Sequence, residues 1–152
     1  MSIISSDLLV FASTGTNSSG GTISGIQIVD ANINNLFPDV TGDQAAAGLT
    51  LYAKIFFLNN NATLTLNNAL VCISSIPFSQ ETIALALGTS SDSNPLNPAL
   101  VYSTPVTVAA ALALDNVGPS DSVGVWIQKV TQPGATVFPA SNVQLTLQGQ
   151  TL

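Results

Sequence analysis

The chain has 152 residues, of which 46% are hydrophobic and only 7% charged, with a formal net charge of −6. This length and apolar content predict one domain whose core is large enough to fold without disulfides. Two basic side chains and no histidine exclude a direct nucleic-acid binder, which needs cations for phosphates, and they exclude His-based catalysis and His metal ligands.

Residues 1–25 are predicted to form a flexible N-terminal arm. The run TGTNSSGGTISG follows the short apolar stretch DLLVFAS and is too poor in apolar side chains to bury much surface. The apolar stretch has no preceding Lys or Arg and lacks the length of a signal sequence, so no secretion signal is expected. Residues 26–152 are then expected to form a single β-sandwich domain.

The stretch LTLYAKIFFLNNNATLTLNNALVCIS, residues 49–74, is predicted to be a β-hairpin with its turn at the three asparagines 59–61. Both faces of the second half of 49–58 are apolar, which indicates a central strand whose outer face is covered by the N-terminal segment or by another subunit. Lys54 is expected to project to solvent, as most strand lysines do, and an amide cross-link to an asparagine is the alternative. Cys72 is predicted to be a buried, inert thiol.

Further strands are predicted from short apolar runs bounded by Gly, Pro, Asn or Ser. They are Ile23–Val29, Thr82–Leu87, Val106–Ala111, Ser122–Val130 and Val143–Gln148. About seven strands at this spacing predict an all-β antiparallel β-sandwich, of the Ig-like or the jelly-roll-like type. The connection over 88–105 is long for a sandwich, and loops of this length usually have a function or a partner.

Motifs that carry chemistry are sparse. The loop DVTGDQ, residues 39–44, has two aspartates but lacks the alternating acids of a calcium loop, so it is interpreted as solvated. There is no nucleophile elbow, phosphate loop or dinucleotide fingerprint. The sequence therefore predicts a protein that is not an enzyme and has no metal and no cofactor. Trp126 is interpreted as a core or interface anchor in preference to a platform for sugar stacking.

Across nearly its whole length the chain resembles small virion structural proteins of tailed bacteriophages. The resemblance lies in SSDLLVFAS, TNSSGGTISG, LYAKIFFLNNNATLTLNNALVCIS, ALALGTSSD and DSVGVWIQKVTQPGATVFPASNVQLTLQG, taken in this order. One departure is that Lys54 is the only basic residue around YAKIFF, where those proteins carry an arginine and a lysine. Several proteins of this kind decorate or cement the head.

The resemblance implies a homotrimer or other small homo-oligomer that binds the major capsid protein on the head surface and stabilises the head against internal DNA pressure. It implies a protein made in the host bacterial cytoplasm, with no contact to nucleic acid or membrane. The expected interface anchors are Phe11, Ile23, Tyr52, Phe56 and Trp126. The alternative function is a glycan-binding or adhesin-type β-sandwich module of a phage tail or fibre or of a cell surface, whose hydroxyl-rich and amide-rich loops form the binding face.

Overall fold

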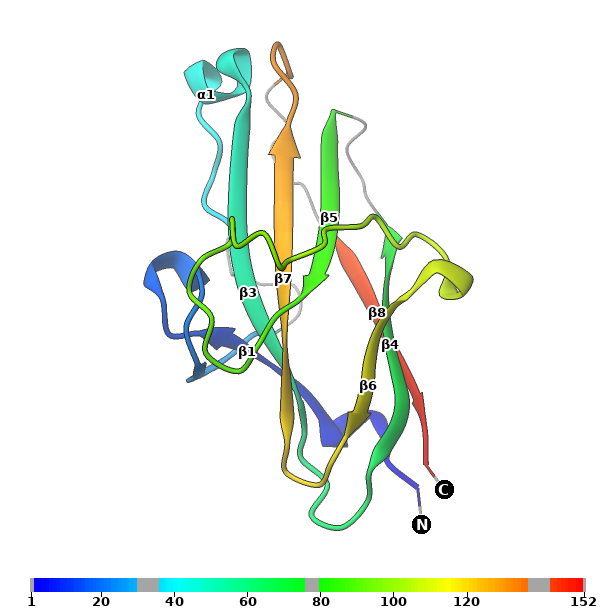
Figure 1. The fold of residues 1–152 in the computed structure, drawn as a ribbon. Helices are drawn as coiled ribbons and strands as arrows, with labels where there is room; N and C mark the ends of the chain where they lie inside the picture. The colour runs from blue at the N-terminus through cyan, green and yellow to red at the C-terminus, as the bar shows by residue number, and fades with distance from the viewer. Residues whose placement is uncertain (1, 30–35, 76–79, 137–142, 152) are drawn as a thin grey trace.

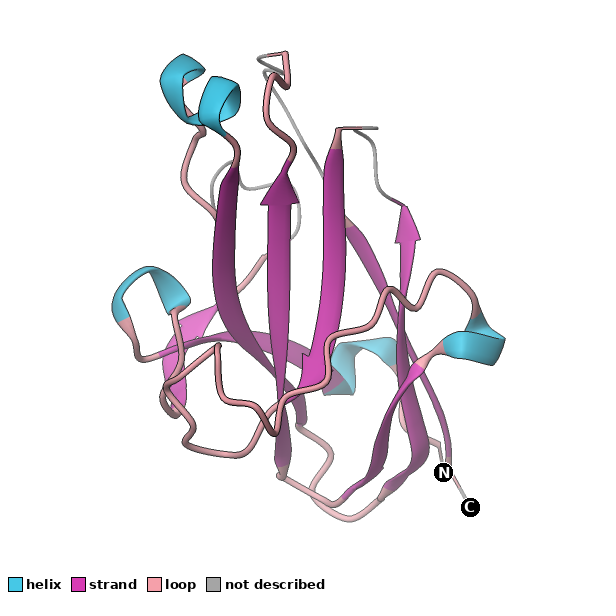
Figure 2. Ribbon diagram, turned by 45° about the horizontal axis from the view of Figure 1, so that its top comes forward, coloured by secondary structure: helices cyan, strands magenta, loops and turns pink. Residues whose placement is uncertain are grey.

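The computed structural model describes residues 2–29, 36–75, 80–136 and 143–151, and it is an all-β fold of two antiparallel sheets. Helices are confined to short segments at the periphery (Figure 2). Among the described residues, no helix has the length and apolar character needed to cross a bilayer. The strands are β1 Leu8–Ser13, β2 Ile23–Gln27, β3 Leu49–Asn59, β4 Leu66–Ser75, β5 Glu81–Leu87, β6 Leu112–Val117, β7 Ser122–Thr131 and β8 Gln144–Gln150.

The larger sheet has the strand order β2-β1-β3-β7-β5, and the smaller sheet has the order β6-β4-β8 (Figure 1). In the larger sheet β3 and β7 pair over ten residues, from Leu49 opposite Thr131 to Leu58 opposite Ser122. The two strands are long because both are apolar on both faces, which suits the middle of a covered sheet.

The hydrophobic core lies between the two sheets. Side chains of β3, β5 and β7 face side chains of β4 and β6, and alternate residues of each strand contribute because successive side chains point to opposite faces. The most buried members are Ile55, Phe57, Leu66, Ala69, Val71, Ile73, Ile83, Leu85, Leu114, Val117, Val125 and Ile127. Cys72 is buried as predicted.

The predicted hairpin over residues 49–74 is wrong, because its two strands belong to different sheets. β3 pairs with β7 along its length and with β1 over the half next to the turn, so no edge is left beside the turn for β4, which pairs with β6 and β8. The asparagines do form the connection. The side chain of Asn59 donates to the backbone oxygens of Leu64, Val117 and Gly118 at 2.8 to 3.1 Å, which turns the chain from one sheet to the other.

The prediction of a flexible arm over residues 1–25 also needs correction. β1 lies next to β3 in the larger sheet, with paired residues from Leu8 opposite Asn59 to Ala12 opposite Ile55. β2 then pairs with β1 at the sheet edge. The apolar run DLLVFAS is short, and its own pattern does not indicate a partner strand. It joins the larger sheet because the edge of β3 next to the turn would otherwise carry unpaired backbone N–H and C=O groups.

Two further elements differ from the sequence prediction. Residues Gly42–Ala47, within and after the stretch read as a solvated loop, form helix α1, which begins with a capping box between Thr41 and Gln44. The strand expected at Val106–Ala111 is displaced to β6. Val108–Ala110 is a 3-10 turn, whose Ala110 N–H donates to the Thr107 side chain at 3.3 Å.

Candidate functional site

The outer face of the larger sheet is covered by two loops of the same chain. The loop over 88–105 crosses in front of β3, β7 and β5 (Figure 1), and the connection between β1 and β2, residues 14–22, lies beside it. The two loops are joined directly, since the Gly21 N–H donates to the Asp92 backbone oxygen at 2.8 Å. Of the two covers expected for this face, the N-terminal segment or another subunit, the structure shows the first, and the 88–105 loop shares the face with it.

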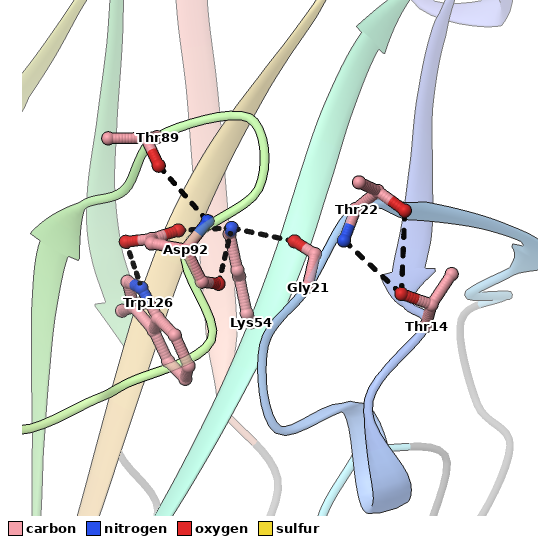
Figure 3. A network of polar contacts seen from close by, with 7 residues as sticks. All are labelled: Thr14, Gly21, Thr22, Lys54, Thr89, Asp92 and Trp126. Atoms are coloured by element: carbon pink, nitrogen blue, oxygen red, sulfur yellow. Dashed lines mark hydrogen bonds and ion pairs between the residues drawn. The ribbon is translucent and has the colours of Figure 1, made fainter.

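Lys54 is the centre of a polar network beneath these loops (Figure 3). Its side chain is 0% exposed, and its ammonium donates to the backbone oxygens of Gly21 and Asp92 at 2.8 and 3.1 Å. The third partner is the Asp92 carboxylate, through Oδ1. Three acceptors match the three protons of an ammonium group, so the buried charge is fully paired.

Trp126 completes this arrangement, which we call the Lys54 network (Gly21, Lys54, Thr89, Asp92 and Trp126). The Trp126 Nε1–H donates to Asp92 Oδ2 at 2.8 Å, and the Asp92 N–H donates to the Thr89 side chain at 3.0 Å. The Lys54 ammonium lies 4.9 Å from the ring centroid of Phe56 and 5.7 Å from that of Trp126. Lys54 on β3 and Trp126 on β7 thereby hold the 14–22 loop and the 88–105 loop against the sheet.

Glycines allow the loops to approach this network closely. A Cβ at Gly20, where φ is +94°, would come within 2.8 Å of the Trp126 ring. A Cβ at Gly124 would lie 2.9 Å from Lys54 Cε and 3.0 Å from the Thr89 backbone oxygen. The distances to the Trp126 ring and to Lys54 Cε are shorter than real carbon–carbon contacts, so these two positions require glycine for packing.

The electrostatics of Asp92 favour an ion pair over a covalent link. Burial alone raises the pKa of Asp92, but hydrogen bonds from Lys54 and Trp126, the charge of Lys54 and the Thr89 contact together lower it below its ordinary value of 3.8. The cross-link considered for Lys54 joins a lysine to an asparagine, but the three acceptors of its ammonium are two backbone oxygens and the Asp92 carboxylate. Lys54 is thus a buried structural cation, and the prediction that it projects to solvent is wrong.

This depressed pKa predicts a specific loss of stability in acid. Because Asp92 has a lower pKa in the folded state, its contribution is complete above the unfolded value of 3.8 and disappears as the pH falls through the folded value. Urea unfolding midpoints measured between about pH 5 and pH 2 should fall more steeply for the native chain than for Asp92→Asn. Equal slopes for the two proteins would contradict this assignment.

The second lysine is also paired, three residues beyond Trp126 on β7. Lys129 Nζ lies 2.9 Å from Glu81 Oε1, and the two side chains are 11% and 6% exposed. The ring of Phe37 lies 5.9 Å from the same ammonium. Since Lys54 and Lys129 are the only basic side chains in the sequence, neither is left to bind an anionic partner.

The five predicted interface residues occupy two different environments. Phe56 and Trp126 are 1% and 0% exposed and pack within their own chain, so neither side chain is accessible to a partner in this conformation. Phe11, directly opposite Phe56 in the sheet, is partly exposed, as are Ile23 and Tyr52. Tyr52 also accepts a hydrogen bond from Gln128 at 3.0 Å and contacts Tyr102, with ring centroids 5.8 Å apart.

The described residues contain no group of three or more His, Cys, Asp or Glu side chains that is arranged to hold a metal ion. In the Lys54 network all three ammonium protons have acceptors, and the network joins the 14–22 loop and the 88–105 loop to β3. Comparisons of the chain with protein-family models, with curated proteins and with solved structures find no match.

Proposed function

We propose that this chain is a non-enzymatic structural protein that acts by binding other proteins in an assembly, most specifically as a decoration protein on the outer surface of a tailed-bacteriophage head. The observation that carries the proposal is the distribution of exposed apolar side chains. In the described part of the chain, five of the eight large ones lie between residues 87 and 108. They are 42% to 77% exposed and comprise Leu87, Leu96, Val101, Val106 and Val108, which are neighbours in the sequence and which we call the apolar loop patch.

Two members of this patch, Leu96 and Val101, lie in the 88–105 loop, and that loop is held in one conformation. Asp92 fixes its first part through the Lys54 network. Farther along, the Tyr102 hydroxyl donates to the Pro95 oxygen at 3.0 Å, and Ser103 exchanges backbone hydrogen bonds of 2.9 and 2.7 Å with Leu85. A loop that is already ordered loses little conformational entropy on docking, which favours a binding role.

The lack of available charge in the apolar loop patch indicates the kind of partner. Between residues 87 and 108 the only charged side chain is Asp92, and it is occupied within the Lys54 network. With both lysines paired as well, the patch suits an apolar, uncharged protein surface and is unsuited to phosphate groups. The major capsid protein of the same particle is the partner that fits the proposed role, and many copies would each contribute a modest interface.

The test is co-sedimentation of the purified chain with empty shells of its source particle, combined with light scattering for its mass in solution. We expect a small oligomer, a trimer in the specific form of the proposal, that saturates the shells at a fixed stoichiometry. Leu96→Asp and Val101→Asp should each weaken binding by about tenfold or more, because a carboxylate would be buried against apolar surface.

Ile26→Asp provides a matched control, because Ile26 on β2 is as exposed as Leu96, at 69%, but lies outside the apolar loop patch. It should bind the shells like the native chain. A monomer that does not bind the shells would refute the proposed function. Equal losses in Leu96→Asp and Ile26→Asp would show that the apolar loop patch is not the docking surface.

A further inference from the structure

A pocket at the side of the larger sheet is separate from the apolar loop patch. It has a volume of about 480 Å³, within the range of small-molecule sites. It lies where β3 has no neighbouring β1, because β1 pairs with β3 only from Ile55 to Asn59. Its lining residues come from the 14–22 loop, from the segment before α1 and from the start of β3, and they are Thr16, Asn17, Ser19, Leu36, Phe37, Pro38, Thr50, Leu51 and Tyr52.

We propose that this pocket binds a neutral carbohydrate, such as one or two sugar residues of a glycan. None of the nine lining residues that the structure describes is charged, so these residues offer no counter-charge to a phosphate, a carboxylate or a metal ion. The lining instead combines two aromatic rings, Phe37 and Tyr52, with hydroxyl groups and the amide of Asn17. Aromatic rings pack against the C–H faces of a sugar, while amides and hydroxyls exchange hydrogen bonds with its hydroxyl groups.

The wall formed by the 14–22 loop is preorganised. Asn17 and Ser18 have φ values of +53° and +57°, a conformation that is uncommon for residues other than glycine and that recurs at binding sites. The loop is closed by a backbone hydrogen bond of 2.8 Å from Gly15 to Gly20. It is anchored from below by Lys54, which donates to Gly21. The buried network thus fixes the 14–22 loop, which carries Asn17, relative to β3, which carries Tyr52.

The open edge of β3 adds backbone groups to the same pocket. Thr50, Leu51 and Tyr52 pair with β7 on one side, and all three line the pocket. Tyr52 is further positioned by the hydrogen bond from Gln128. A rigid strand on one side and a closed loop on the other give a site whose shape does not depend on the apolar loop patch. The inference therefore stands independently of the proposed function.

The experiment is a titration of the purified full chain, followed by ligand-observed NMR and calorimetry. One arm uses free neutral monosaccharides and short neutral oligosaccharides, a second uses purified neutral cell-surface polysaccharide, and a third uses charged uronic acids. We expect millimolar Kd values for the neutral free sugars and tighter apparent binding to the polymer if it presents several copies of the same unit. Uronic acids should bind more weakly by about tenfold or more.

Two matched variants locate the site. Asn17→Gly keeps the positive φ without strain and removes the amide, so it should weaken sugar binding by about tenfold while the fold is preserved. Asn68→Gly makes the same exchange at a φ of +49° on β4, in the other sheet, and should bind like the native chain. Phe37→Ala should reduce binding through loss of the ring.

Three results would overturn the inference. One is that no neutral sugar in either arm binds at tens of millimolar. Another is that Asn17→Gly and Phe37→Ala both bind as tightly as the native chain. The third is that uronic acids bind as well as their neutral counterparts. Because shells are absent from every arm, these results are independent of whether the chain docks on a capsid.

Discussion

Replacement of Lys54 by methionine is expected to lower the free energy of unfolding by about 3–5 kcal/mol, the usual cost of removing one partner of a buried ion pair. Methionine fills much of the space of the lysine stem, so the loss arises mainly from the polar groups that remain. The Asp92 carboxylate, 11% exposed, would lose its counter-charge, and the backbone oxygens of Gly21 and Asp92 would lose their donor. Urea denaturation at neutral pH measures this difference.

The double variant Lys54→Met/Asp92→Asn separates the charge from the packing. Because no unpaired carboxylate is left, it should recover part of the stability that Lys54→Met loses. Amide exchange at Gly21, whose N–H donates to the Asp92 oxygen, should be faster in both variants. A loss below about 1 kcal/mol in Lys54→Met would show that this ion pair does not anchor the loops.

Trp126→Ala is the second substitution with a large expected effect, a loss of about 3–5 kcal/mol in the free energy of unfolding. The ring is 0% exposed and is covered by Gly20 and Gly88, one from each loop, so its removal leaves a cavity that neither glycine can fill. It also removes the hydrogen bond to Asp92 Oδ2. Thermal unfolding followed by circular dichroism gives the comparison.

Trp126→Phe is the control for the hydrogen bond. It keeps an aromatic ring and loses the indole N–H, so the expected cost is about 1–3 kcal/mol, from the partner left unsatisfied at Asp92 and a reduced contact area. Its stability should therefore lie between those of the native chain and Trp126→Ala. If Trp126→Phe is as unstable as Trp126→Ala, the ring volume contributes less than this structure indicates.

The alternation of apolar and polar residues predicted where individual strands lie. The alternation of residues 49–58 identified the central strand β3, and its two apolar faces correctly indicated an outer cover. What failed was pairing. The turn-forming asparagines at the end of β3 are compatible with a hairpin or with a crossover to a second sheet. The choice depends on β1 and β7, which are distant in sequence and occupy both edges of β3 next to these asparagines.

The candidate sites show the same division. The pattern around Trp126 predicts an anchor, but nothing in the sequence links it to Asp92, which lies in a stretch of serines and asparagines. The partner of Lys54 was equally hidden, because a contact between residues 38 positions apart has no periodic signal. Helix α1 is different. Thr41 and Gln44 form a capping box, and a Thr followed three residues later by Gln is a helix-start pattern that is visible in the sequence.

The strand order of the larger sheet determines when that sheet can form. β7 lies between β3 and β5, although it follows both in the sequence. During synthesis, β3 therefore lacks one of its neighbouring strands until Thr131 has left the ribosome. Until then β5 lacks any strand partner in its sheet. Pairing between such distant segments is slow, and unpaired strand edges favour aggregation while they persist. The larger sheet is thus completed in one late step, and substitutions that weaken β7 should reduce the yield of folded protein at high expression temperature before they alter the finished fold.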